Sequence, residues 1–365
     1  MSGYHHLVRN HEVRRGRGAP ANTPSTRFDV PGYEADIDWL DTREIVDDGA
    51  PPLRTTVTCE TPRKIISRNT SPDVPFDRSM NAYRGCEHGC VYCFARPTHA
   101  YLGLSPGLDF ESRLTVKPSA AVLLRTELSR RSYCPAVIAM GTNTDPYQPI
   151  EATHRITRAC LEVLRDFRHP VSITTKSDRV VADLDVLQDL AAQGLVAVVI
   201  SVTSLDRVVA RTLEPRAATP ARRLAAIRAL IDAGVPTWVS VSPVIPAITD
   251  HEIETILEAA AAAGAVGAFV RPVRLPHEVA PLFRGWLDAH YPDRADHVMS
   301  LIRSMRGGRD NDPDFGTRMK GVGPYADLLH QRARLAKARF GLDRPRGSLR
   351  TDLFQVPAGP QLTLF

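Results

Sequence analysis

The unit that decides the fold is residues 171–202, which read VSITTKSDRVVADLDVLQDLAAQGLVAVVISV. Two runs rich in β-branched residues, Val171–Thr175 and Val196–Val202, enclose a segment with helical spacing of its apolar side chains, Val180–Gln193. Gly194 follows that segment, where a helix C-terminal cap belongs. Both strand runs are almost continuously apolar, as in strands that are buried on both faces of a parallel sheet. The stretch therefore predicts a strand–helix–strand unit with a right-handed crossover.

The alternation of strand and helix patterns continues over residues 76–275. Strands are expected at Met80–Arg84, Ala136–Gly141, Val171–Thr175, Val196–Val202, Thr237–Ser242 and Ala265–Arg271, with helices at Ser119–Arg131, Glu151–Phe167, Val180–Gln193, Pro220–Ala233 and Asp250–Ala263. A full (β/α)₈ barrel needs about 250 residues, and this region is shorter. We therefore predict an α/β fold built on a partial (β/α)6 TIM-type barrel, with its active site at the carboxyl ends of the strands.

Three further segments flank the predicted barrel. Residues 1–75 are rich in Pro, Gly, Asp and Arg, and they predict an irregular N-terminal extension. Residues 276–340 show helical periodicity and predict a set of C-terminal helices that form a cap. Residues 341–365 are dominated by Pro, Gly and Arg and predict a flexible basic tail.

The composition describes a soluble globular protein. Of the 365 residues, 43% are hydrophobic and 24% are charged, which excludes a wholly disordered or fibrous chain. No stretch approaches the roughly 20 unbroken apolar residues of a membrane span, and the first residues lack the apolar run of a secretory signal, so we expect a cytoplasmic protein. Residues 332–350 carry seven Arg and Lys side chains against one Asp. Such a stretch could attract phosphates of a nucleic acid, or it could be a solvated helix face and tail.

The segment richest in chemistry is residues 81–97, NAYRGCEHGCVYCFARP, which spaces Cys86, Cys90 and Cys93 as C-x₃-C-x₂-C. Thiols this close in a reducing compartment are more often metal ligands than disulfide partners. Three thiolates could bind three irons of a cubane cluster, although four is the usual number. Together with His88 or His99 they could instead form a structural Cys₃His zinc site, or they could be incidental buried thiols. The spacing alone leaves these alternatives open.

The sequence around the cysteines resembles the radical S-adenosylmethionine (radical SAM) superfamily. Five ordered segments resemble its spore photoproduct lyase-like branch: Asn81–Pro97, Gly141–Glu151 (GTNTDPYQPIE), Ile173–Ser177 (ITTKS), Leu213–Arg216 (LEPR) and Val239–Asp250 (VSVSPVIPAITD). The resemblance implies that Cys86, Cys90 and Cys93 ligate a [4Fe-4S] cluster whose open iron binds SAM. It further implies that one electron cleaves SAM to methionine and a 5′-deoxyadenosyl radical, which abstracts hydrogen from a substrate.

The resemblance also implies which residues bind SAM. Thr144 and Asp145 match the family's contact to the methionine amino group, and an aspartate there could pair with the ammonium; Asp145 could equally begin a turn. Lys176 matches the contact to the SAM carboxylate, unless it is an ordinary lysine at a strand end. Ser201 resembles a ribose or carboxylate contact. These residues would follow the second, third and fourth strands of the barrel.

Two weaker matches and one departure complete the expected site. Tyr92 resembles the residue whose backbone meets the adenine, and Arg216 could be a second carboxylate partner or a surface charge. The lyase carries a hydrogen-donating cysteine immediately before the residue that matches Thr144, but this chain has Asn143 there. Cys134 lies at the other end of the second strand and Cys160 falls in a helix pattern. The final hydrogen donor therefore stays open.

The substrate is not defined by the sequence. Damaged DNA, a tRNA base and a small molecule all fit the radical SAM interpretation, and resemblance to a DNA lyase favours a nucleic acid and a role in DNA repair. The resemblance also implies a one-electron reductant such as a flavodoxin or ferredoxin as partner. The alternative from another class is a non-catalytic, zinc-stapled module associated with nucleic acid.

The last residues of the chain suggest a protein partner. Gln361, Leu362, Leu364 and Phe365, with a small polar residue between the leucines, resemble the pentapeptide with which bacterial DNA polymerases and repair proteins bind the sliding clamp. The three apolar side chains could anchor in an apolar groove at the end of a flexible tail. The tail could also fold back onto the C-terminal helices.

Overall fold

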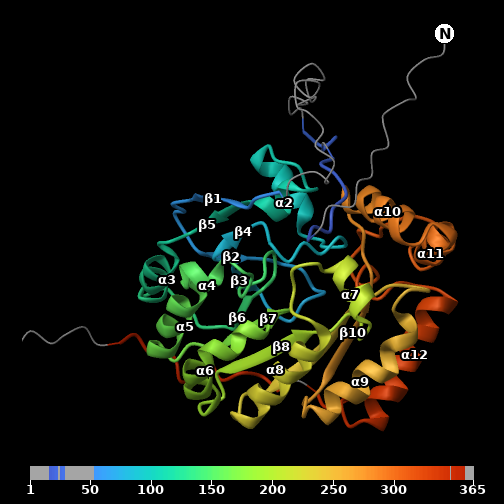
Figure 1. Cartoon of the computed structure of the whole chain (residues 1–365). Coiled ribbons are helices and arrows are strands. Elements are labelled where there is room, and N and C mark those ends of the chain that lie inside the picture. Colours follow the sequence, from blue (N-terminus) through green and yellow to red (C-terminus); the bar gives the residue numbers. More distant parts are fainter. Residues whose placement is uncertain (1–15, 24, 29–52, 346, 358–365) are drawn as a thin grey trace, which may run out of the picture.

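The computed structural model describes residues 16–23, 25–28, 53–345 and 347–357 (Figure 1). Its strands are β1 (Thr56–Cys59), β2 (Ile66–Arg68), β3 (Arg78–Met80), β4 (Tyr83–Arg84), β5 (Arg113–Val116), β6 (Ile138–Met140), β7 (Val171–Thr175), β8 (Val196–Ser201), β9 (Thr237–Val244) and β10 (Ala268–Pro272). Two of them, β1 and β2, fall within residues 1–75, the predicted N-terminal extension.

A mostly parallel sheet forms the body of the protein. Within the described residues it has seven strands in the order β10-β9-β8-β7-β6-β3-β2. Every neighbouring pair from β10 to β3 is parallel, and β2 joins β3 in antiparallel fashion at the edge. The six parallel strands confirm the predicted partial barrel. A second, three-stranded sheet of β1, β5 and β4 lies beside it.

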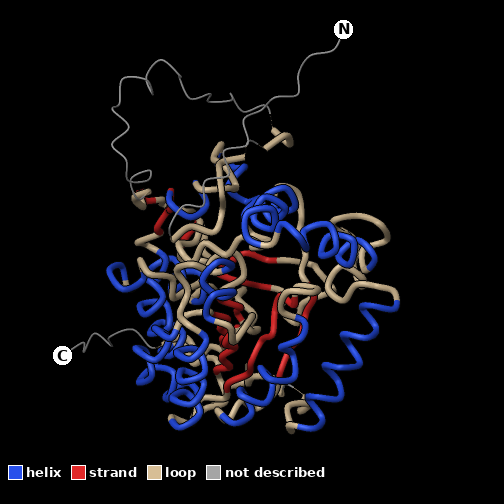
Figure 2. The backbone as a smooth tube through the Cα atoms, turned by 45° about the vertical axis from the view of Figure 1, so that its right-hand side comes forward, coloured by secondary structure: helices blue, strands red, loops and turns tan. Residues whose placement is uncertain are grey.

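Helices cover the outside of the curved sheet (Figure 2). The α-helices are α2 (Asp109–Ser112), α3 (Ala120–Leu128), α4 (Glu151–His154), α5 (Ile156–Asp166), α6 (Leu184–Ala191), α7 (Arg207–Leu213), α8 (Pro220–Asp232), α9 (Ile253–Ala262), α10 (Val279–His290), α11 (Ala295–Ser304) and α12 (Pro324–Arg339). Four 3₁₀ segments accompany them: η1 (Arg96–Leu102), η2 (Asp178–Asp183), η3 (Asp250–Glu252) and η4 (Pro292–Arg294). No helix in this described part is long and apolar enough to cross a membrane.

The helix predicted over residues 151–167 is interrupted at one residue. Arg155 has a φ of 49° and separates α4 from α5. The carboxylate of Glu151 accepts hydrogen bonds from the backbone N–H groups of Thr157 and Arg158, at 3.2 Å each. A side chain thus satisfies donors at the start of α5 that a continuous helix would have bonded through its backbone.

The cysteine loop, residues 85–93, is held between the barrel and the C-terminal helices. Cys90, Val91 and Tyr92 share an apolar cluster with residues of α10 and α11, including Phe283 and Trp286. All six residues of β8 are buried, so the main sheet is packed on both faces at this strand. Helices α10 and α11 therefore pack against the cysteine loop.

The predicted C-terminal tail is anchored over part of its length. The N–H of Arg350 bonds the carbonyl of Gly194 at 3.1 Å, and the N–H of Gln355 bonds the carbonyl of Phe167 at 3.1 Å. The Phe354 ring packs against Phe167 and His169, with centroid distances of 6.2 and 5.6 Å. Residues 350–355 therefore pack against the amino ends of β7 and β8, where the sequence predicted flexibility. The motif Gln361–Phe365 lies outside the described residues.

Candidate active site

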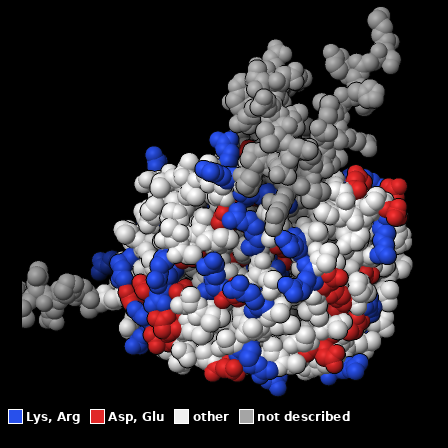
Figure 3. Space-filling view, viewed as in Figure 1, with Lys and Arg blue, Asp and Glu red and all other residues white. Residues whose placement is uncertain are grey.

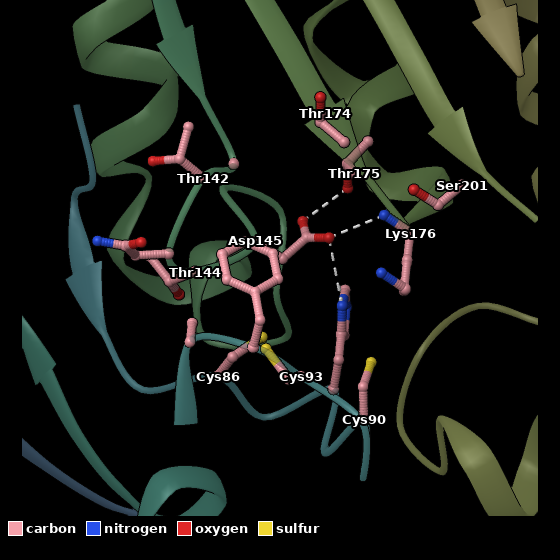
Figure 4. Close-up of a pocket in the computed structure, with 15 residues that line it drawn as sticks. Cys86, Cys90, Cys93, Thr142, Thr144, Asp145, Thr174, Thr175, Lys176 and Ser201 are labelled. Atoms are coloured by element: carbon pink, nitrogen blue, oxygen red, sulfur yellow. Dashed lines mark hydrogen bonds and ion pairs between the residues drawn. The ribbon is translucent and has the colours of Figure 1, made fainter. Parts of the chain in front are cut away.

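A pocket opens at the carboxyl ends of β6, β7 and β8 (Figure 4). Its lining comes from the cysteine loop and from the residues that end these three strands. The lining residues are Cys86, His88, Cys90, Cys93, Phe94, Ala95, Gly141, Thr142, Asn143, Thr144, Asp145, Thr174, Thr175, Lys176 and Ser201. The structure thus brings together the three predicted cluster cysteines and four of the predicted SAM contacts: Thr144, Asp145, Lys176 and Ser201.

The three loop cysteines have the chemistry that an iron–sulfur cluster requires. The structure describes all six cysteines of the chain, and only Cys86, Cys90 and Cys93 line the pocket. Burial raises the pKa of Cys90 to about 12 and that of Cys86 well above its ordinary value. The thiols of Cys86 and Cys90 are therefore neutral in the absence of a metal, and binding of a metal would displace their protons. Three thiols that line one cavity match the need of an iron–sulfur cluster for several sulfur ligands.

Each histidine of the Cys₃His zinc alternative already has one ring nitrogen engaged. The Nδ1 atom of His88 lies 3.3 Å from a carboxylate oxygen of Asp145, and the Nε2 atom of His99 lies 3.0 Å from the carbonyl oxygen of Arg113. His99 is not among the residues that line the pocket. Within the described chain, no group of three or more His, Cys, Asp or Glu side chains is arranged to hold a single metal ion.

Asp145 is fixed in place by four donors. Its carboxylate accepts hydrogen bonds from the hydroxyl of Thr175 at 2.6 Å and from the backbone N–H groups of Lys176 and Tyr147, and it faces His88 (Figure 4). Burial would raise the pKa of Asp145, but His88 and these hydrogen bonds outweigh it and lower the pKa to about 2. The pocket therefore presents a permanently ionised carboxylate at the ends of β6 and β7.

Thr144 ties the β6 loop to the cysteine loop. Its hydroxyl donates to the carbonyl of Gly85 at 2.7 Å and accepts from the side-chain amide of Gln148 at 2.8 Å. The amide oxygen of Gln148 in turn accepts from the N–H of Glu87 at 2.9 Å. Gln148 was not singled out from the sequence, although it lies within the GTNTDPYQPIE segment. The segment thus orients the cysteine loop as well as lining the pocket.

Lys176 and Ser201 bring a cation and a hydroxyl to the opposite wall. Burial would lower the pKa of Lys176, but neighbouring acidic groups that include Glu214 outweigh it and raise the pKa, so the ammonium stays charged. Its Nζ lies 5.9 Å from the centroid of the Tyr92 ring. Ser201 ends β8 and is buried. Tyr92 is buried behind the pocket rather than lining it.

A buried ion pair that the sequence did not reveal supports this wall. The carboxylate of Glu214 contacts the guanidinium of Arg223, and their side chains are 0% and 1% exposed. Glu214 also accepts hydrogen bonds from the hydroxyls of Tyr92 and Thr203. The Nη1 of Arg223 donates to the carbonyl of Ser201 at 3.1 Å. The pair therefore joins the cysteine loop to the end of β8.

Arg216 lies outside the pocket lining. Its Nη2 is 2.9 Å from the carboxylate of Glu87, and its Nη1 donates to the hydroxyl of Thr55 at 3.3 Å. Its backbone N–H bonds the carbonyl of His88. These contacts join the LEPR segment to the cysteine loop from the side, and a role of Arg216 as a SAM carboxylate contact stays a prediction.

Comparison with known proteins identifies the class. The family model of the Radical SAM superfamily matches residues 80–260. An uncharacterized protein of Mycobacterium tuberculosis is 36% identical over 296 residues, which cover 80% of this chain and 83% of the relative. An uncharacterized protein of Methanocaldococcus jannaschii is 27% identical over 173 residues, 47% of this chain and 62% of that protein. The chain belongs to the radical SAM superfamily and is a radical SAM enzyme.

Within the superfamily, the fold is that of spore photoproduct lyase. A mutant of that lyase superposes with a TM-score of 0.53 at 16% identity, over 78% of this chain and 79% of the lyase chain. The lyase complexed with dinucleoside spore photoproduct superposes with a TM-score of 0.52, also at 16% identity, over 78% and 79% of the two chains. At this identity the likeness shows a shared fold, which confirms the partial barrel and carries no substrate with it.

Proposed function

We propose that the three loop cysteines hold a [4Fe-4S] cluster and that SAM binds beside it in the same pocket. The observation that carries the proposal is that these thiols and two opposite charges meet in one cavity. Three thiols from one loop share a cavity with an ionised carboxylate, Asp145, and a charged ammonium, Lys176. The methionine part of SAM carries an ammonium and a carboxylate, and these two charges are complementary to the carboxylate and the ammonium of the pocket.

The residues of the pocket have separate tasks in this proposal. Asp145 pairs with the SAM ammonium, Lys176 with its carboxylate, and Ser201 with the ribose or carboxylate. When bound, the cluster supplies the electron that cleaves SAM to methionine and a 5′-deoxyadenosyl radical. The buried part of the lining, which includes Cys90, Thr175 and Ser201, keeps water from the reacting groups. Thr144 and Tyr92 hold the walls that orient these side chains.

The substrate class that the surface favours is a nucleic acid. Lys and Arg side chains gather around the hollow in the middle of the face that Figure 3 shows. Among the exposed residues that follow the pocket strands are Arg179 in η2 and Arg207 and Arg211 in α7. Cations around an active-site mouth attract phosphates. Transfer of deuterium from a labelled DNA lesion into 5′-deoxyadenosine would support this class, and transfer only from a small molecule would exclude it.

The pocket also bears on how the reaction ends. Asn143 lines it at the position where the lyase has its hydrogen-donating cysteine. Cys134 is exposed outside the pocket, and Cys160 is fully buried in α5. Because residue 143 is Asn, we infer that the hydrogen atom taken up by the product radical comes from another group. The last step of the reaction then differs from that of the lyase.

Iron binding tests the cluster assignment. After anaerobic reconstitution with iron and sulfide, about four irons per chain are expected, the stoichiometry of one cubane. Cys90→Ala removes one thiol of the pocket and should lose most of this iron. Cys134→Ala removes an exposed thiol outside the pocket and should keep it. A colourless protein that holds a single zinc would overturn the proposal in favour of the zinc-stapled module.

The proposed partners are a one-electron reductant and the sliding clamp. A flavodoxin or ferredoxin would supply the electron. The clamp assignment rests on Gln361, Leu362, Leu364 and Phe365, which follow the anchored residues 350–355. A pull-down with purified clamp should retain the intact chain and lose a chain without residues 361–365. Equal retention of both chains would remove the clamp from the proposal.

A further inference from the structure

An N-terminal strap, residues 16–23 and 25–28, lies directly on the cysteine loop. Figure 1 shows this blue segment between α2 and α10. A Cβ atom added to Gly18 would lie 1.7 Å from the carbonyl oxygen of Gly89 and 3.2 Å from the backbone nitrogen of Val91. The two backbones therefore touch between the first and second cysteines of the loop, where only a glycine leaves room.

A buried carboxylate links the strap to the loop. Glu111, whose side chain is 0% exposed, accepts the backbone N–H groups of Gly18 at 3.0 Å and Ala19 at 2.7 Å. It also pairs with the guanidinium of Arg96, which is equally buried. The N–H groups of Arg96 donate to the carbonyls of Gly89 at 3.1 Å and Cys90 at 2.8 Å. Each step in this chain is a hydrogen bond between buried residues.

Further contacts hold the strap along its length. The side-chain amide of Asn22 donates to the carboxylate of Asp109 at 3.2 Å, and the backbone N–H of Asp109 donates to the side-chain oxygen of Asn22 at 3.0 Å. Arg27 pairs with Glu278 at 2.9 Å and donates to the carbonyl of Pro97 at 2.7 Å. The carbonyl of Ala21 lies so close to Gly107 that a Cβ there would approach within 2.2 Å.

We propose that the N-terminal strap is a positioning element of the cluster site, which fixes the backbone of Gly89 and Cys90 and shields the loop from solvent. The inference rests on the proposed function, because it assigns the strap to the proposed cluster. Without the strap, Glu111 keeps Arg96 but loses two backbone donors in a buried setting, so the Arg96 contacts to the loop lose their fixed anchor. Outer contacts of this kind orient metal ligands.

Two glycine variants test the strap from opposite sides. Gly18→Ala forces the strap away from Gly89, and Gly107→Ala forces it away at Ala21. Gly347→Ala is the matched control, because nothing lies within 4 Å of a Cβ at that position. Reconstituted proteins are mixed with a chelator, and the loss of the visible absorbance of the cluster is timed. The midpoint potential and the electron paramagnetic resonance spectrum of the reduced cluster are recorded in parallel.

We expect Gly18→Ala and Gly107→Ala to release iron roughly 10- to 100-fold faster than the control, the range seen when outer contacts of a metal site are lost. We also expect both to shift the potential or the spectrum. Release and spectra identical to Gly347→Ala would overturn the strap assignment. If Gly18→Ala does not fold, Asn22→Ala loosens the strap without touching the loop and should still speed release. If the unmodified protein takes up no iron, the proposed function fails instead.

Discussion

Replacing Arg223 with methionine tests whether the ion pair behind the pocket is shielded from water, as its burial indicates. Arg223 is the ion-pair partner of Glu214, and both side chains are buried. Its guanidinium also donates to the carbonyls of Ser201 and Ala218, at 3.1 and 2.7 Å. Arg223→Met fills a similar volume but leaves the buried carboxylate of Glu214 without its ion-pair partner, and two carbonyls lose a donor.

The expected cost follows from the burial of the ion pair. Removing one partner of a buried ion pair typically destabilises a protein by about 3–5 kcal/mol, because the other charge stays buried and unpaired. Burial would raise the pKa of Glu214, yet Arg223, Lys176 and its hydrogen bonds lower it from 4.5 to about 2. A shift of that size corresponds to roughly 3 kcal/mol of stabilisation of the ionised form, to which all these groups contribute together. We therefore expect Arg223→Met to lower the free energy of unfolding by about 3–5 kcal/mol.

The assay is denaturant unfolding of the protein without cofactor, with Arg222→Met as the control. Arg222 is the adjacent residue of α8, but its side chain is 68% exposed, and its pairing with Asp178 is worth at most about 1 kcal/mol. The folded-state pKa of Glu214 is depressed, so its contribution is present above pH 4.5 and is lost as pH falls toward 2. Arg223→Met should flatten this acid dependence. Equal stability of the two variants would refute the conclusion that Arg223 and Glu214 form a buried ion pair.

Two further predictions concern other titratable groups. Lys176→Met should weaken binding of SAM to the reconstituted protein by roughly 10- to 150-fold, because one charged hydrogen bond is lost. Calorimetric titration measures the affinity, and Lys320→Met, at an exposed residue, is the control that should bind SAM normally. Equal affinities of the two variants would remove Lys176 from the SAM site. Burial lowers the pKa of His169 from 6.5 to about 4, so its contribution to stability is present above pH 6.5 and is lost as pH falls toward 4. His169→Gln should lose less stability over that interval in acid titrations of unfolding, and an unchanged profile would contradict the assignment.

The sequence predicted the sheet well because its strands are buried on both faces. Residues 171–175 and 196–201 stand out as apolar runs, and the structure places β7 and β8 there. The first strand was harder to place. Residues expected to form one strand, Met80–Arg84, are divided between the end of β3, which pairs with β6 in the main sheet, and β4, which pairs with β5 in the small sheet. Such short strands carry little periodicity, and their pairing depends on distant residues.

The groups that hold the cysteine loop were missed for a different reason. Glu111 and Arg96, and likewise Glu214 and Arg223, form fully buried ion pairs. In a sequence, such residues look like ordinary surface charges, because charged side chains are rarely buried unless they are paired. Only the tertiary structure shows which charges meet. The anchoring of Phe354 was missed because Leu353 and Phe354 form only a short apolar run within residues 341–365, where Pro, Gly and Arg are frequent.

The central claim is that the cysteine loop and the strand ends form one site for a cluster and SAM. Its most direct measurement is the formation of 5′-deoxyadenosine and methionine from SAM by the reconstituted, reduced protein under strictly anaerobic conditions. The account predicts both products in equal amounts from the unmodified protein and from Cys134→Ala, and none from Cys90→Ala. Products formed equally by Cys90→Ala, or absent from an unmodified protein that holds its full iron, would contradict the account.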